Sequence, residues 1–102
     1  MNKILNFLGL CMKAGKIISG EQGVESAIKN NKAKFVIIAS DASNNTIKKF
    51  KNSSSYYNID FFIGFSKEEI SLAIGKYNIA VIAILDENFS KKIKEFCNDL
   101  VI

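Results

Sequence analysis

Apolar residues recur along this chain at the spacing of amphipathic helices, in segments that begin near residues 3, 20, 44, 66 and 87. Each segment carries an apolar stripe that we expect to pack inward. The first helix ends near residue 14, the third dissolves in residues 52–55, and the fourth ends at Gly75. Ser66 and Glu69 form a capping-box pattern, which predicts the start of the fourth helix.

Short runs of consecutive apolar residues lie between these helices and indicate strands. Residues 35–39 and 79–85 have the pattern of strands covered on both faces, residues 61–65 form another apolar strand, and residues 17–18 form a brief extended piece. The alternation predicts an α/β fold, a three-layer α/β/α sandwich with a mixed four-stranded sheet and about five helices. We expect residues 1–102 to form a single domain.

Positive charge is concentrated in the first half of the chain. The net charge is +4, and all fourteen basic residues are lysine. Residues 1–51 carry nine lysines against three acids, whereas residues 52–102 carry five lysines against seven acids. Lysine suits phosphates but lacks the planar fork with which arginine reads guanine. The charge therefore favours recognition of a nucleic-acid backbone, although a low-GC codon bias would also enrich lysine.

The chain offers little catalytic chemistry. It has no histidine, and Gly20 and Gly23 form only an isolated G-x-x-G rather than a known phosphate-binding loop. Cys11 and Cys97 lie far apart on apolar helix faces, which predicts buried reduced thiols and no metal site. No apolar stretch reaches the roughly 18 residues of a membrane span. We expect a cytoplasmic, non-enzymatic protein without catalytic residues, cofactor, metal or membrane attachment.

The turn before the second helix combines several features that suit a nucleic acid. A helix N-terminus offers unpaired N–H groups and a partial positive charge, and Gly20 allows a partner to approach closely. Lys16 precedes this turn, and Lys29 and Lys32 follow it along the helix. Glu21 would repel a phosphate, but its carboxylate could accept hydrogen bonds from a base. A solvated lysine-rich surface is the alternative interpretation.

Asp41 follows the buried strand at residues 35–39, where doubly wound folds keep functional acids. A receiver-like phospho-accepting aspartate is one hypothesis, although its usual acidic and lysine partners are not apparent. The other interpretation is that Asp41 caps the next helix or turn.

Two long runs resemble the ribosomal-protein family that binds kink-turns in RNA, the L-seven-Ae superfamily, and especially its small bacterial members. They are LGLCMKAGKIISGEQGVESAIKNNKAKFVIIASDAS and SKEEISLAIGKYNIAVIAI. The most specific feature is G-K-x-x-x-G followed downstream by V-I-x-A-x-D. The resemblance covers nearly the whole chain from Leu5 to the last strand. It implies a non-enzymatic protein that grips bent RNA, ribosomal or otherwise structured.

The resemblance also implies where RNA would bind. The family uses a glycine-led turn and the loop before the last strand, which correspond to residues 20–26 and 75–78. Together with the neighbouring lysines, the predicted RNA-binding residues are Lys16, Gly20, Glu21, Gln22, Gly23, Ser26, Lys29, Lys32, Lys76 and Tyr77.

Three of these positions depart from the residues usual in kink-turn binders. The family typically carries Asn or Lys at Gln22, Glu or Gln at Gly23, and Lys at Ser26. The first hypothesis is an RNA-binding protein, with further protein partners in a ribonucleoprotein. The alternative is a protein-interaction module that keeps the fold but has lost specific RNA contacts.

Overall fold

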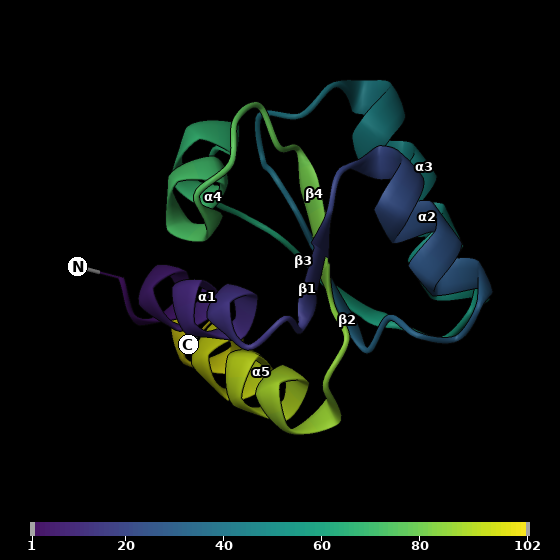
Figure 1. Cartoon of the computed structure of the whole chain (residues 1–102). Coiled ribbons are helices and arrows are strands. Elements are labelled where there is room, and N and C mark those ends of the chain that lie inside the picture. The colour runs from purple at the N-terminus through teal and green to yellow at the C-terminus, as the bar shows by residue number, and fades with distance from the viewer. Residues whose placement is uncertain (1, 102) are drawn as a thin grey trace.

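Two helical layers cover the two faces of a central sheet (Figure 1). The structure is a computed structural model and describes residues 2–101, with side chains up to residue 98. Its elements are α1 (Lys3–Lys13), β1 (Ile17–Ser19), α2 (Glu21–Lys29), β2 (Phe35–Ile38), α3 (Asn44–Tyr56), β3 (Asp60–Ile63), α4 (Lys67–Ile74), β4 (Val81–Ile84) and α5 (Glu87–Val101). Helices α2 and α3 lie on one face, and α1, α4 and α5 lie on the other. The predicted three-layer α/β/α sandwich is confirmed.

The sheet is mixed, with strand order β1-β4-β2-β3. β2 and β3 are parallel, whereas β4 runs antiparallel to both of its neighbours. β1, β2 and β3 therefore point the same way, and α2, α3 and α4 all begin where these strands end. We call that end of the molecule the turn end (residues 20–23, 39–43, 64–66 and 75–80) and the opposite end the base end (residues 13–16, 30–34, 57–59 and 85–87).

Apolar burial is greatest in the two central strands. All residues of β2 and β4 are buried, which agrees with the prediction of strands covered on both faces. Edge strand β3 is only partly covered. It stops at Ile63, earlier than predicted. Phe65 adopts a positive φ of 63°, which extended strand does not have, although the Gly64 N–H still donates to the Ile38 carbonyl oxygen at 3.1 Å and the Ser40 N–H to the Phe65 carbonyl oxygen at 2.9 Å. The hydrophobic core therefore lies along both faces of β2 and β4.

Helix α3 is longer than the sequence predicted. Residues 52–55 form helix rather than a loop, and the helix ends only at Tyr56. Serine has a modest helix propensity, but Ser54 is fully buried, and its carbonyl oxygen accepts a hydrogen bond from the Ile59 N–H at 2.8 Å. Tertiary packing thus overrides the local preference. The capping box of Ser66 and Glu69 is present as predicted.

Asp41 caps a helix, but not the next one along the chain. Its Oδ1 accepts a hydrogen bond from the Lys67 N–H at 2.8 Å, at the start of α4, whereas Ser43 caps α3. The expectation that Asp41 would cap the next helix or turn is therefore wrong in its target. The bond crosses from the end of β2 to the first turn of α4 and ties two elements of the turn end together.

We expect Asp41→Ala to lower the free energy of unfolding by about 1 kcal/mol, because the start of α4 loses its acceptor. Asp41→Asn should cost less, since an amide oxygen can accept the same bond. Urea unfolding of the two variants measures the difference. Equal stabilities for Asp41→Ala and the wild type would contradict this role.

The two cysteines are buried and unpaired, as predicted. Burial raises the pKa of both thiols to about 11, and nearby Asp86 adds to the effect at Cys11. None of the described helices is long and apolar enough to cross a membrane.

The thiols should be inert in the folded protein, because they stay protonated and covered. We expect no reaction with a disulfide reagent at pH 8 until denaturant is added. Burial also couples the thiols to the stability of the fold. Since the folded pKa exceeds the ordinary value of 9.0, the protonated thiols contribute their full stabilisation below pH 9, and this stabilisation is lost as pH rises towards 11. Cys11→Ser and Cys97→Ser identify which thiol reacts. Fast reaction of either thiol in the native protein would contradict the assignment.

Candidate nucleic-acid interface

Gly20 forms the turn between β1 and α2. Its φ of 89° lies in a region that other residues adopt only with strain. The Gly20 N–H donates to the Val81 carbonyl oxygen at 3.0 Å, which fastens the turn to the start of β4. No side chain caps α2, so its first N–H groups point out of the helix without a side-chain acceptor. This end of α2 can receive hydrogen-bond acceptors from a ligand.

Glu21 is held by the neighbouring helix. Its Oε2 accepts a hydrogen bond from the Thr46 hydroxyl at 3.2 Å, and the Ser43 hydroxyl donates to Thr46 Oγ1 at 2.9 Å. The chain of bonds fixes the first turn of α2 relative to the first turn of α3. Thr46 is not among the site residues predicted from the sequence. Its only local signal is the Ser43-x-x-Thr46 spacing of a helix cap, which says nothing about a bond to Glu21.

Gly23 faces the protein. A Cβ atom there would lie 2.9 Å from Cγ1 of Ile18 on β1, so glycine allows α2 to pack closely on the strand. Gln22 is exposed in the same turn. Ser26 is also exposed, but its Oγ accepts a hydrogen bond from the side-chain amide of Asn30 at 3.2 Å. Of these three residues, Gln22 is the one whose side chain is exposed to solvent and has no described hydrogen-bond partner within the protein.

The loop between α4 and β4 lies at the same end of the molecule. Gly75 ends α4 in a left-handed conformation, with φ of 70°. Buried Ser71 anchors the loop, because its Oγ accepts a hydrogen bond from the Ile79 N–H at 2.8 Å. Tyr77 stands in the middle of the loop and is 93% exposed, next to exposed Lys76. The structure therefore brings Lys76 and Tyr77 to the end that carries the Gly20 turn.

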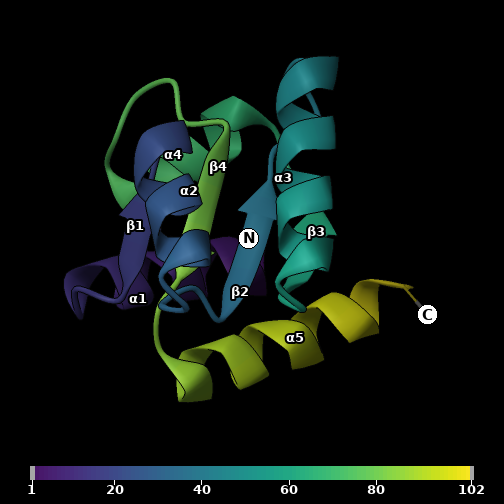
Figure 2. The same cartoon turned by 90° about the vertical axis from the view of Figure 1, so that its right-hand side faces the viewer.

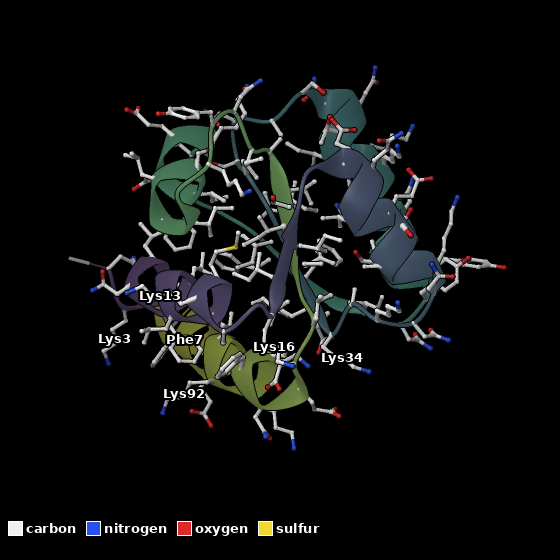
Figure 3. The ribbon with its side chains drawn as sticks, viewed as in Figure 1. Lys3, Phe7, Lys13, Lys16, Lys34 and Lys92 are labelled. Atoms are coloured by element: carbon white, nitrogen blue, oxygen red, sulfur yellow. The ribbon has the colours of Figure 1, made fainter. Side chains whose placement is uncertain are left out.

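Three predicted lysines do not join this cluster. Lys16 lies at the opposite end of β1 from Gly20, because the extended strand separates them (Figures 1 and 3). Lys29 ends α2, about 12 Å along the helix from its start, and Lys32 follows in the connection to β2. Figure 2 shows α2 running from the turn end to the base end. The predicted site thus divides into the residues of the turn end and separate lysines at the base end.

Lys29 is also engaged in an ion pair. Glu25 bridges its ammonium at 2.9 Å and that of Lys49 at 2.7 Å. Hydrogen bonding to Lys49 and then to Lys29 lowers the pKa of Glu25 to about 2. The negative charge of Glu25 offsets part of the positive charge on this side of the molecule.

A hollow of about 720 Å³ lies away from the turn, against the free edge of β3. It is lined by Phe35, Ser55, Asn58, Ile59, Asp60, Phe61, Phe62, Lys94, Cys97 and Asn98. None of the predicted RNA-binding residues contributes to it.

The chain belongs to the ribosomal protein L7Ae/L30e/S12e/Gadd45 family, whose model matches residues 2–94. It is similar to "RNA-binding protein YlxQ" of Enterococcus faecium, with 50% identity over 91% of this chain and 89% of the relative. It is 37% identical to the protein of the same name from Bacillus subtilis (strain 168), over 84% of this chain and 86% of that one. The resemblance to this family and to its small bacterial members is confirmed.

The fold is also similar to that of solved structures. A Bacillus halodurans protein described as of unknown function superposes with a TM-score of 0.93 and 32% identity, over 96% of this chain and 99% of that one. A Giardia lamblia protein described as a 15.5kD RNA binding protein superposes with a TM-score of 0.81, over 93% of this chain and 82% of the other. At 18% identity, the second likeness bears on the fold alone.

We expect the Glu25 ion pairs to be visible by NMR titration of its carboxyl carbon. The midpoint should lie near pH 2 and should rise more in Lys49→Gln than in Lys29→Gln, because Lys49 is the larger cause of the shift. The pairs stabilise the fold above the ordinary Glu pKa of 4.5, and this contribution is lost as pH falls towards 2. Lys51→Gln is the matched control, because Lys51 lies on α3 with Lys49. An unshifted midpoint in the wild type would contradict the geometry.

Proposed function

We propose that this protein is a non-enzymatic RNA-binding protein that docks structured RNA at its turn end. The carrying observation is the first turn of α2, which begins at Gly20 without a side-chain cap and lies at the same end as the loop of Lys76 and Tyr77. The names of the two bacterial relatives support RNA as the ligand.

The two parts of this site suit different parts of an RNA. The N–H groups of α2 and the Gln22 amide can pair with base edges or phosphate oxygens. Tyr77 offers an exposed ring on which an unstacked base can stack, and Lys76 offers a point charge for a phosphate. Bases of this kind are accessible where an RNA helix is bent or bulged. The proposed ligand is therefore a kink-turn, in ribosomal or other structured RNA, with protein partners in the resulting ribonucleoprotein.

Two features of α2 favour a second candidate function. Gly23 packs towards Ile18 and presents no side chain, and Ser26 is tied to Asn30. Fewer side chains are thus available for reading bases than in typical kink-turn binders. The second candidate is a protein-interaction module that retains the family fold. Partners that remain bound after nuclease treatment of a lysate would favour it, and partners that disappear would count against it.

We expect the wild type to bind a kink-turn hairpin more tightly than a straightened control in a gel shift, and binding should weaken as salt rises. Tyr77→Ala should weaken hairpin binding about tenfold or more, because base stacking on an aromatic ring contributes about 1–3 kcal/mol. Tyr56→Ala is the matched control, since Tyr56 is 81% exposed but ends α3 at the base end.

Each outcome of this titration decides a separate point. Absence of binding to either RNA at low salt contradicts the RNA function. Equal binding to both RNAs contradicts kink-turn preference while leaving RNA binding intact. Equal losses in Tyr77→Ala and Tyr56→Ala contradict the placement of the site at the turn end.

A further inference from the structure

A second set of lysines lies at and around the base end, away from the Gly20 turn (Figure 3). It comes from three separate parts of the chain: α1 with the connection to β1, the residue before β2, and α5. We call it the base-end lysine surface, and its members are Lys3, Lys13, Lys16, Lys34 and Lys92. All five side chains are exposed.

The end of the sheet holds two of these lysines close together. The Leu85 N–H donates to the Lys16 carbonyl oxygen at 2.8 Å, and the Lys34 N–H donates to the Ile84 carbonyl oxygen at 2.7 Å. Lys16 and Lys34 therefore flank the last residues of β4 on its two sides, about 10 Å apart at the backbone. Neither position depends on a flexible loop, because both backbones are bonded to the central strand.

An aromatic cluster holds two more lysines. The Phe7 ring meets Phe89 and Phe96 edge to face, at centroid distances of 5.6 and 5.9 Å. The ammonium groups of Lys3 and Lys92 each lie 5.5 Å from the centre of the Phe96 ring, so their separation cannot exceed twice that distance. Lys13 lies at the other end of α1 from Lys3, about 15 Å along the helix. The surface is therefore long enough to span several consecutive phosphates of one nucleic-acid strand.

Nearby acids neutralise this surface only in part. Asp86 accepts a hydrogen bond from the Phe89 N–H at 2.9 Å, and Glu87 lies in the first turn of α5, so both face the positive end of that helix. Oε2 of Glu95 lies 3.8 Å from Nζ of Lys92 and pairs with it. Among the residues with described side chains, Lys3, Lys13, Lys16 and Lys34 have no ion-pair partner. An excess of positive charge remains.

We propose that the base-end lysine surface binds the phosphate backbone of an RNA segment separate from the one at the turn end, so that one protein contacts two RNA segments. The proposal rests on the proposed RNA-binding function. Lysine ammonium groups suit phosphates, and the Phe7 and Phe96 rings are partly buried against the core rather than presented to bases. Leu10 is exposed on α1, but one leucine is too small an apolar surface for docking to a membrane.

The test uses the full chain and two RNA probes: the kink-turn hairpin for the turn end and an unbent RNA duplex for the base end. The triple variant Lys13→Gln/Lys16→Gln/Lys34→Gln should bind the duplex at least about tenfold more weakly. Its plot of log affinity against log salt should be shallower by about 2–3, because each lost phosphate contact removes about 0.9. Hairpin binding should change much less.

A matched control removes the same charge elsewhere. Lys48→Gln/Lys51→Gln/Lys67→Gln changes lysines of α3 and the start of α4 and should retain both the duplex affinity and the salt slope. Equal losses in the two triple variants would overturn the proposal, because net charge alone would explain them. An unchanged duplex affinity in the base-end variant would also overturn it.

The same titrations separate this inference from the proposed function. If Tyr77→Ala weakens hairpin binding while the base-end variant binds the duplex normally, only the second surface is refuted. If the base-end variant loses duplex binding while Tyr77→Ala has no effect, the second surface is supported and the turn-end site fails. If the wild type binds neither RNA, both are refuted.

Discussion

Strand β4 pairs antiparallel with β1 on one side and with β2 on the other, and all of its residues are buried. β1 has only three residues, so its position depends on this pairing, with Ile18 opposite Ala83. The bond from the Gly20 N–H to the Val81 carbonyl oxygen extends the pairing into the turn. At the base end of β1, the hydrogen bond from the Leu85 N–H to the Lys16 carbonyl oxygen extends the pairing to Lys16. One central strand thus positions both ends of β1 and the chemistry that each carries.

The two ends of the molecule offer different kinds of contact. The turn end presents helix N–H groups, the Gln22 amide and the exposed Tyr77 ring, which in the proposed function contact the bases of an RNA. The base end presents ammonium groups, which recognise phosphates irrespective of sequence. Lysine is the only basic residue in the chain, so recognition of guanine by an arginine fork is excluded at both ends.

Lysine-rich sequence does not translate directly into available positive charge. Glu25 bridges Lys29 and Lys49, which leaves the α2–α3 side less positive than its lysine count implies. Exposed ion pairs of this kind contribute little to stability, but they remove charge that a phosphate would otherwise meet. Lys16 and Lys34, in contrast, have no ion-pair partner among the described side chains. The distribution of acids therefore matters as much as that of lysines.

The sequence by itself determined the layers, the central strands, the helix starts and the glycine turn. A run of apolar, largely β-branched residues such as 35–38 is typical of a strand covered on both faces, and a capping box such as Ser66 with Glu69 is a local signal of a helix start. Only the tertiary structure decided that Asp41 caps α4, that Glu21 bonds Thr46 and that Lys16 lies away from Gly20. These relations join segments far apart in the sequence, or depend on strand direction and length. They follow from strand order and helix packing, which local residue patterns do not encode.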